Sequence, residues 1–253
     1  MITSFDFKDR TILVTGGTKG IGKSIVLALL ESKARVVLTY SSDEGAASDF
    51  DMFLRKKKNY NYMLLRSDVA DRQDVRHLLR ESCEKWGQSI FGIVNNAGIL
   101  TQGDFFTLSN KQWDKTLEVN LKGPFIICQE AIKALGQDGA IVNIASVGGQ
   151  IGGDRAPDYA ASKAGLISLT RSLARIGSQY GVRVNAVAPG WIETPIFSED
   201  QLGELKDKAK EVIPMGRIGN PEEVAKPVLF LLSDAASYIT GHCLNVNGGL
   251  YFG

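Results

Sequence analysis

The sequence is poor in the residues that build metal centres and disulfide frameworks. Only two histidines, His77 and His242, and three cysteines, Cys83, Cys128 and Cys243, occur among the 253 residues. The histidines have no partner three or four residues away, and the cysteines are far apart and odd in number. Zinc sites and disulfide frameworks need closely spaced or paired ligands. We therefore expect no metal site, and the cysteine content favours a reducing cytoplasm.

The chain also lacks long apolar runs and an excess of charge of either sign. No apolar stretch approaches the roughly 20 residues of a membrane-spanning helix, and the charged N-terminal segment does not resemble a signal peptide. Lysine and arginine number 29, aspartate and glutamate 28, and the net charge is +1. We expect neither nucleic acid nor a membrane as a partner. The one dense basic run, Arg55 to Lys58, is interpreted as a solvated helix end.

Short apolar segments rich in β-branched residues alternate with longer segments of helical periodicity. The expected strands cover residues 11–16, 34–40, 61–68, 89–98, 139–146, 182–190 and 242–249, and the main helical patterns cover 21–33, 71–86, 111–135 and 163–180. Strict alternation is typical of a parallel sheet with right-handed crossovers. Because no linker-like segment interrupts it, we expect one α/β domain over residues 1–253. A (β/α)₈ barrel has a similar length, but seven strands favour a doubly wound, mainly parallel Rossmann-type sheet.

The first expected strand leads into a glycine-rich turn, VTGGTKGIGKS. Gly16, Gly20 and Gly22 stand between a strand and a helix, where glycine lets the backbone approach a ligand. The free amides and positive end of the following helix suit a pyrophosphate. Alone, such a turn is equally typical of an ordinary strand-to-helix connection. Its place after the first strand of an alternating pattern favours dinucleotide binding.

The end of the second expected strand indicates which dinucleotide is bound. NAD sites usually carry Asp or Glu about 20 residues after the glycines, where it binds the ribose hydroxyls. Here the strand ends in the hydroxyl residues Thr39 to Ser42, and the first acid is Asp43. Lys19, inside the glycine turn, could pair instead with the 2′-phosphate of NADP. The sequence favours NADP over NAD; the alternative is an exposed Lys19 and a ribose-binding Asp43.

Further polar residues follow in a fixed order along the chain. NNAG (residues 95–98) comes after the fourth expected strand, and Asn120, Ser146, Tyr159 and Lys163 follow, then Pro189-Gly190 with Thr194 beyond. In this order and spacing, from Thr11 to Gly253, the chain resembles the short-chain dehydrogenase/reductase family. The resemblance implies an NAD(P)-dependent enzyme that transfers a hydride between nicotinamide and a carbonyl or secondary alcohol.

The resemblance implies four catalytic residues, and the chemistry of their side chains agrees. A tyrosine with a pKa of about 10 is a poor proton donor at neutral pH, and a nearby cation lowers that pKa. Lys163, one helical turn from Tyr159, is placed to do so. In the family, the lysine also binds the nicotinamide ribose, the serine at Ser146 holds the substrate oxygen, and the asparagine at Asn120 interrupts a helix and holds a water. Singly, Ser146 could be a strand-end cap, Asn120 a helix kink and Asn95 a turn residue.

The resemblance also implies a set of cofactor and substrate contacts spread over the chain. The expected cofactor residues are Gly16, Thr18, Lys19, Gly20, Ile21, Gly22, Tyr40, Ser41, Ser42, Asp68, Val69, Asn95, Asn96, Ala97, Gly98, Tyr159, Lys163, Pro189, Gly190, Ile192 and Thr194. The expected substrate contacts are Ser146, Gln150, Tyr159 and Trp191. Residues from about 191 to 215 are expected to form a lid over a partly apolar site.

Within the family, three stretches are most similar to 3-oxoacyl-acyl-carrier-protein reductases of fatty acid biosynthesis. They are VNAVAPGWIET (184–194), IPMGRIGNPEEVA (213–225) and YITGHCLNVNGG (238–249). Those enzymes meet the acidic carrier with basic residues, and Gln137 and Tyr180 stand at the matching positions here. Neutral side chains cannot pair with an acidic partner, so the carrier is an open question.

Three functions therefore remain in view. The first is a 3-oxoacyl reductase or a similar enzyme acting on a small carbonyl or alcohol substrate, an acyl thioester included. The second is a sugar or secondary-alcohol dehydrogenase of the same family. The third is a dinucleotide-sensing regulator without activity, against which the intact set of Asn120, Ser146, Tyr159 and Lys163 argues. The resemblance also implies a homotetramer.

Overall fold

A parallel sheet organises the computed structural model, which describes residues 5–59, 61–136, 138–196 and 198–253. Its strands are β1 (Thr11–Val14), β2 (Arg35–Tyr40), β3 (Tyr62–Arg66), β4 (Ile90–Asn95), β5 (Ala140–Ile144), β6 (Arg183–Pro189) and β7 (Cys243–Val246). In the described part of the chain they form one seven-stranded sheet in the order β3-β2-β1-β4-β5-β6-β7, with every pairing parallel. The doubly wound sheet expected from the sequence is confirmed, and it is parallel throughout rather than mainly so.

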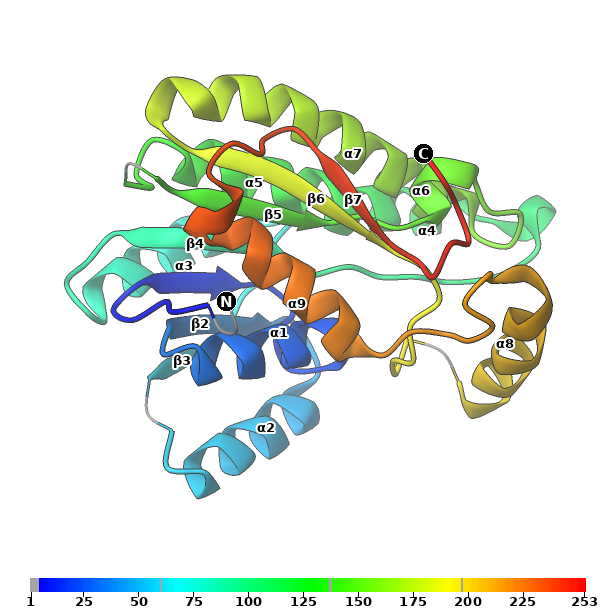
Figure 1. The fold of residues 1–253 in the computed structure, drawn as a ribbon, viewed down its shortest axis with the longest axis horizontal. Helices are drawn as coiled ribbons and strands as arrows, with labels where there is room; N and C mark the ends of the chain where they lie inside the picture. The colour runs from blue at the N-terminus through cyan, green and yellow to red at the C-terminus, as the bar shows by residue number, and fades with distance from the viewer. Residues whose placement is uncertain (1–4, 60, 137, 197) are drawn as a thin grey trace.

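Helices cover both faces of this sheet (Figure 1). They are α1 (Gly20–Glu31), α2 (Glu44–Lys56), α3 (Arg72–Glu84), α4 (Asn110–Leu117), α5 (Gly123–Ala131), α6 (Gly148–Ile151), α7 (Pro157–Gly177), α8 (Glu199–Val212) and α9 (Pro221–Leu232). Short 3₁₀ turns occupy Phe105–Thr107, Ser178–Tyr180 and Asp234–Ala236. Among the described residues, no helix is long and apolar enough to cross a membrane.

Two apolar layers follow from the alternation of side chains along the buried strands. Ile12 and Val14 of β1 pack in the layer that contains α1 and α9, whereas Leu13 between them packs in the layer that contains α3, α5 and α7. Successive strand residues point to opposite faces, so both faces of a central strand must be apolar. This explains why the strands read as continuous apolar runs rather than as alternating ones.

The helix expected over residues 111–135 is divided into three parts. α4 ends at Leu117, a π-type turn occupies Glu118–Lys122, and α5 begins at Gly123. A Cβ on Gly123 would lie 2.8 Å from a methyl carbon of Val69, so a glycine is required where α5 passes the loop after β3. The π-type turn contains Asn120, the residue expected to interrupt a helix.

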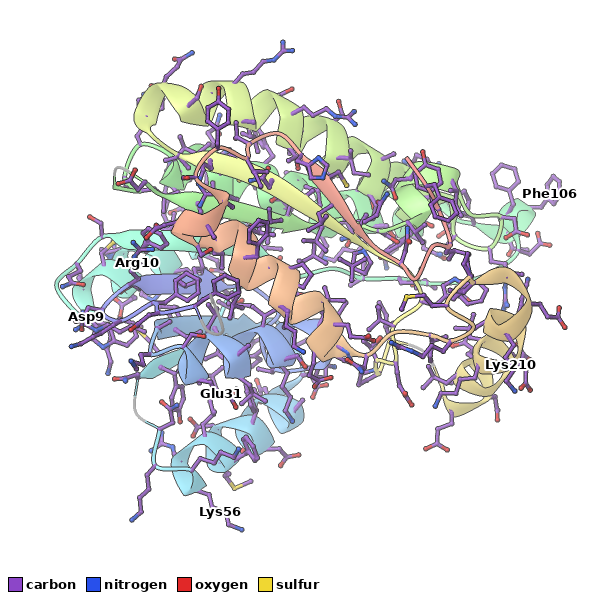
Figure 2. All side chains as sticks on the ribbon, viewed as in Figure 1. Asp9, Arg10, Glu31, Lys56, Phe106 and Lys210 are labelled. Atoms are coloured by element: carbon purple, nitrogen blue, oxygen red, sulfur yellow. The ribbon has the colours of Figure 1, made fainter. Side chains whose placement is uncertain are left out.

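Two other helix boundaries bear on function. α7 starts at Pro157, six residues before the expected start, so Tyr159 and Lys163 both lie in its first two turns. The small residues of DYAASKAG conceal this start, because the apolar periodicity becomes visible only from Leu166 onward. α2 ends at Lys56, which extends into solvent (Figure 2), so the interpretation of the basic run as a helix end is confirmed.

Candidate active site

The turn after β1 is bonded to the loop after β4. Thr15 Oγ1 accepts hydrogen bonds from the backbone N–H groups of Asn96 (3.1 Å) and Ala97 (3.0 Å). Asn96 Nδ2 donates to the carbonyl oxygens of Thr15 and Gly16, both at 2.9 Å. A Cβ on Gly16 would lie 3.1 Å from Ala97 Cα, and one on Gly22 would lie 2.2 Å from Gly16 O. The Asn96 side chain thus holds together two of the stretches expected to bind the cofactor.

The N-terminus of α1 is open for an anion. Its N-cap residue, Lys19, makes no side-chain capping hydrogen bond, and the first turn of the helix contains no acid. The first amides of a helix and its dipole attract a negative charge. A Cβ on Gly20 would lie 3.4 Å from Thr194 Cβ, so the start of the expected lid lies against this turn. The arrangement fits the pyrophosphate of a dinucleotide.

Charged side chains surround the end of β2. Lys19 Nζ lies 2.6 Å from Asp43 Oδ2, and Asp43 Oδ1 caps α2 by accepting a hydrogen bond from Ala46 N at 3.0 Å. The bond from Lys19 and the one from Ala46 hold the pKa of Asp43 below its usual range. Arg66, the last residue of β3, donates from Nε to the carbonyl oxygen of Ser41 at 3.1 Å. Sequence reasoning missed Arg66, because its approach to Ser41 depends on β3 lying beside β2 in the sheet.

The other expected cofactor residues lie at the ends of the strands or beside them. Thr18, Ile192 and Thr194 are buried, and Tyr40, Ile21, Asp68, Asn96 and Gly190 are half-buried, while Ser41 and Ser42 are exposed. Val69 is buried in the apolar layer of α3, α5 and α7. Pro189 ends β6, and a Cβ on Gly190 would lie 2.8 Å from Asn247 Cα.

The side chain of Asn95 takes part in a buried hydrogen-bond network away from these residues. Asn95 Nδ2 donates to Asn143 Oδ1 at 2.8 Å, and Asn143 Nδ2 donates to Thr170 Oγ1 of α7 at 2.8 Å. Cys128 Sγ lies 3.5 Å from Asn95 Nδ2, and burial raises the pKa of the Cys128 thiol to about 12. The side chain of Asn95 therefore joins β4 to β5, which leaves its backbone as the part available to a cofactor.

Ser146, Tyr159 and Lys163 lie together at the carboxyl ends of the strands. Lys163 Nζ donates to the carbonyl oxygen of Ile144 at 2.7 Å and lies 5.6 Å from the centre of the Tyr159 ring. Lys163 is 3% exposed, and burial lowers its pKa to about 8. Burial raises the pKa of Tyr159, and a hydrogen bond with Ser146 acts in the opposite direction. Ser146 Oγ itself accepts a hydrogen bond from Gly148 N at 3.1 Å.

Asn120 is fully buried, and its side chain connects two segments beside Lys163. Its Oδ1 accepts from Ile99 N at 2.8 Å, and its Nδ2 donates to Ile99 O at 2.9 Å and to Ser162 Oγ at 3.1 Å. Both amide hydrogens are therefore used. A Cβ on Gly98 would lie 3.2 Å from Asn120 Oδ1 and 3.5 Å from Lys163 Nζ. Asn120 thus fixes the loop after β4 next to α7.

The expected substrate contacts divide between the site and the lid. Gln150, on α6, is half-buried, and its Oε1 has no hydrogen-bond partner in the part of the chain that the structure describes. Trp191 packs against Ala209 and Ile213 of the α8 region. Gln201 Nε2 of α8 donates to Gln102 Oε1, in the loop after β4, at 3.3 Å. Phe197, inside the expected lid, lies outside the described residues.

A parallel doubly wound sheet with these groups at its switch point defines an α/β dinucleotide-binding oxidoreductase. A family model described as enoyl-(acyl carrier protein) reductase matches residues 16–251. The 3-oxoacyl-(acyl-carrier-protein) reductase FabG of Staphylococcus aureus is 37% identical over 244 residues, which cover 96% of this chain and 98% of that protein. Its namesake from Aquifex aeolicus is 40% identical over 254 residues, with coverages of 96% and 97%.

Solved structures agree with the sequence relatives. The crystal structure of a short-chain dehydrogenase/reductase, glucose/ribitol dehydrogenase, from Brucella melitensis has a TM-score of 0.89 and 32% identity, and covers 99% of this chain and 100% of that one. A blue fluorescent protein from a metagenomic library, in complex with NADPH, has a TM-score of 0.89 and 30% identity, with coverages of 98% and 100%. The chain belongs to the short-chain dehydrogenase/reductase family and is an NAD(P)-dependent oxidoreductase that acts on carbonyl or alcohol groups.

Proposed function

We propose that the protein is an NADPH-dependent reductase of 3-oxoacyl thioesters, with Tyr159 as the proton donor. The observation that carries this proposal is the buried ammonium group of Lys163, 5.6 Å from the Tyr159 ring. The substrate class is supported by relatives named 3-oxoacyl-(acyl-carrier-protein) reductase at 36–40% identity over nearly the whole chain.

The chain's own residues supply the proton and hold the substrate, while the bound nicotinamide supplies the hydride. Reduction requires a proton for the carbonyl oxygen, which the Tyr159 hydroxyl gives. Ser146 Oγ accepts from Gly148 N, and its O–H can turn from Tyr159 to the substrate oxygen and stabilise the developing charge. The Lys163 cation favours the phenolate that remains on Tyr159.

The preference for NADPH rests on two cations at the end of β2. Lys19 and Arg66 come from different elements and approach the same strand end, where Tyr40, Ser41 and Ser42 carry hydroxyl groups. Their counter-ions are Asp43 and Glu44, which are 46% and 71% exposed. A 2′-phosphate can take over such solvent-exposed pairs at small cost, because exposed ion pairs contribute only about 0–1 kcal/mol.

A second candidate is a sugar or secondary-alcohol dehydrogenase. It is favoured by the likeness to the structure named glucose/ribitol dehydrogenase and by Tyr180, a neutral residue at a position where carrier-dependent enzymes are expected to have a base. Tyr180 is 38% exposed, and Lys133 Nζ lies 5.9 Å from the centre of its ring. Gln137, the other neutral residue at an expected docking position, lies outside the described residues.

The lid expected from the sequence belongs to this proposal. α8 stands away from the sheet (Figure 1) and packs through Ala209 and its neighbours against Trp191 and Leu250. The hydrogen bond from Gln201 to Gln102 joins it to the opposite wall of the site. Closure of residues 191–215 over the bound cofactor would exclude water from the reacting groups.

A homotetramer is the proposed assembly. An apolar groove runs over the α4–α5 segment and α7, where Leu121, Phe125 and Leu169 line it and Phe125 is 39% exposed. Such a surface fits a second copy of the chain. Light scattering tests this assembly directly, and a monomer at micromolar concentration would contradict it.

The test of the function is a substrate panel followed by the absorbance of NADPH. It contains a short 3-oxoacyl thioester, free and on an acyl carrier protein, together with diketones and several ketoses. We expect oxidation with the free thioester. Oxidation with ketoses alone would favour the second candidate. No oxidation with any compound, despite tight NADPH binding, would favour a dinucleotide-sensing regulator.

A further inference from the structure

Two side-chain hydrogen bonds join α7 to the α4–α5 segment, and they share one spacing. Thr116 Oγ1 donates to Asp158 Oδ2 at 2.7 Å, and Asn120 Nδ2 donates to Ser162 Oγ at 3.1 Å. Thr116 and Asn120 are four residues apart, as are Asp158 and Ser162. The two bonds therefore lie one turn apart along both segments. We call them the first rung (Thr116–Asp158) and the second rung (Asn120–Ser162).

Each rung immediately precedes a residue of the proposed active site. Asp158 is followed by Tyr159, and Ser162 is followed by Lys163. Neighbouring residues on a helix point about 100° apart, because a turn holds 3.6 residues. With Asp158 and Ser162 turned toward α4 and the π-type turn, Tyr159 and Lys163 are turned toward the strand ends. The rungs thus determine both the rotation of α7 and its position along its own axis.

The first rung buries a carboxylate, which is an energetically costly group for a packing contact. Asp158 is 0% exposed and Thr116 is 1% exposed. Within the described residues, Asp158 Oδ1 has no hydrogen-bond partner, and Oδ2 is held by the Thr116 hydroxyl. An isolated buried carboxylate is costly, although the first turn of a helix favours an anion. An apolar pair would pack the two helices at lower cost, but it would allow them to slide.

A small polar cavity lies beside the first rung. Its volume is about 30 Å³, and it is lined by Asp158 together with Thr101, Gln112 and Arg155. A cavity with at least about 10–15 Å³ of such space can hold one water molecule. A water in it would give Asp158 Oδ1 a donor and would connect α7 to the loop after β4.

We propose that Thr116 and Asp158 are positioning residues for the reaction: the first rung sets the register of α7, and with it the placement of Tyr159 against Ser146 and of Lys163 against Ile144. This inference rests on the proposed function, because it assumes that Tyr159 gives the proton. A residue that acts on register affects the reacting geometry rather than substrate binding, and a small misplacement of a reacting group can cost about a hundredfold in rate.

The test compares matched substitutions on the two helices. Thr116→Val removes the donor with little change in shape, and Thr116→Ser keeps it. Asp158→Asn keeps an acceptor oxygen without the charge, and Asp158→Ala removes it. The control is Thr170→Val on α7: Thr170 is also 1% exposed, and its Oγ1 accepts from Asn143 Nδ2 at 2.8 Å, seven residues beyond Lys163. Unfolding in urea, kcat and KM are measured for each, with NADPH and a short 3-oxoacyl thioester or whichever panel compound is reduced.

We expect Thr116→Val to lower kcat about tenfold or more with KM changed by less than about twofold. Thr116→Ser and Asp158→Asn should restore kcat to within about threefold, and Asp158→Ala should behave as Thr116→Val does. Thr170→Val should lose stability, since a buried partner is left unsatisfied, but keep its kcat. A normal kcat in Thr116→Val, or an equal loss in Thr170→Val, would overturn the inference.

Tyr159→Phe separates this inference from the proposal on which it rests. If that variant retains its turnover, the proposed function is wrong, whatever the rung variants do. If it is inactive while Thr116→Val and Asp158→Ala fold and turn over normally, only the positioning role is wrong. Should Thr116→Val not fold, the contrast between Asp158→Asn and Asp158→Ala decides the same question.

Discussion

Lys19 Nζ and Asp43 Oδ2 lie 2.6 Å apart, at the strand end where the cofactor ribose is expected. The two side chains are 51% and 46% exposed. The sequence left two alternatives here, a cation for a 2′-phosphate or an acid for the ribose hydroxyls, and the structure pairs the two residues with each other. If Lys19 binds the 2′-phosphate of NADPH, that phosphate must draw it away from Asp43, whereas NADH lacks this phosphate.

Asp43→Asn should strengthen the binding of NADPH and leave that of NADH nearly unchanged. The amide frees Lys19 and removes a negative charge that would repel the 2′-phosphate, while Asn caps α2 as well as Asp does. Because exposed ion pairs are worth about 0.2–1 kcal/mol, we expect the Kd of NADPH to fall by about twofold to fivefold. Nicotinamide fluorescence measures both dissociation constants.

Two further variants complete this measurement. Lys19→Ala and Arg66→Ala should each weaken the binding of NADPH more than that of NADH, because Lys19 pairs with Asp43 and Arg66 bonds to Ser41, both just after the end of β2. Asp51→Asn serves as the control, since Asp51 pairs with Arg55 within α2 and lies outside the expected site. Tighter binding of NADH than of NADPH by the unaltered protein would refute the preference for NADP.

Tyr159→Phe should abolish nearly all turnover and preserve the affinity for NADPH. The phenyl ring keeps the shape of the site, but the hydroxyl that is proposed to give the proton, and that bonds to Ser146, is lost. General acid catalysis is worth about 10²–10⁴-fold, so kcat should fall at least about a hundredfold. Stopped-flow turnover and fluorescence titration of NADPH test the two halves of this prediction. Undiminished reductase activity would remove Tyr159 from the mechanism.

The buried Lys163 should make the folded protein more stable as the pH rises above about 8. Burial holds its folded-state pKa at about 8, whereas an unfolded lysine has a pKa of about 10.4. Between these values the unfolded chain binds more protons, so the free energy of unfolding increases with pH. Below about pH 8 the folded protein bears the full cost of burying the charged lysine, about 3 kcal/mol. Above about pH 10.4 this cost is absent.

Lys163→Met isolates this effect, because all other titrating groups are shared. The difference in unfolding free energy, unaltered protein minus variant, should increase from pH 8 to pH 9.5 in urea titrations. The titrations end at about pH 9.5 because tyrosine ionises at higher pH. Burial raises the pKa of Tyr159, so in the folded protein it stays protonated over this range. A difference that is flat or decreases over this range would show that Lys163 does not titrate in it.

Local patterns explain what could be predicted from the sequence. The strands and the glycine turn are short segments whose residue types decide their conformation. Tyr159 and Lys163 are four residues apart, so any helix through this stretch places them on one face. The interruption of the helix at Asn120 was predicted from the family resemblance alone, because the apolar pattern of residues 111–135 indicates one continuous helix.

Contacts between distant segments explain what could not be predicted. Arg66 reaches Ser41 because β3 lies beside β2 in the sheet, which no spacing along the chain indicates. The first rung joins Thr116 and Asp158, 42 residues apart. The side chain of Asn95 turns to Asn143 because the two are partners in the register of β4 and β5. Each relationship depends on strand order or helix packing, which are properties of the whole fold.

Gly148 and Gly149 are adjacent, but alanine should have opposite effects at the two positions. A Cβ on Gly149 would lie 2.6 Å from the carbonyl carbon of Lys163, and that backbone cannot move without moving α7. A Cβ on Gly148 would lie 3.5 Å from Ser146 Oγ and 4.0 Å from Tyr159 Cε1, in ordinary van der Waals contact. Only position 148 has space for a Cβ, and that space borders Ser146 and Tyr159, the two residues expected to hold the substrate oxygen.

Gly149→Ala should therefore destabilise the fold, whereas Gly148→Ala should keep or raise its stability, since alanine in a helix is favoured over glycine by about 0.5–1 kcal/mol. The effect of Gly148→Ala should appear in substrate choice: kcat/KM should fall more for carbonyl compounds with bulky groups beside the carbonyl than for the smallest ones. Gly203→Ala is the control, because it adds the same methyl in α8 where no atom lies within 4 Å. Equal losses for small and bulky substrates would show that position 148 does not limit substrate size, because a methyl group that only perturbed Ser146 would slow every substrate alike.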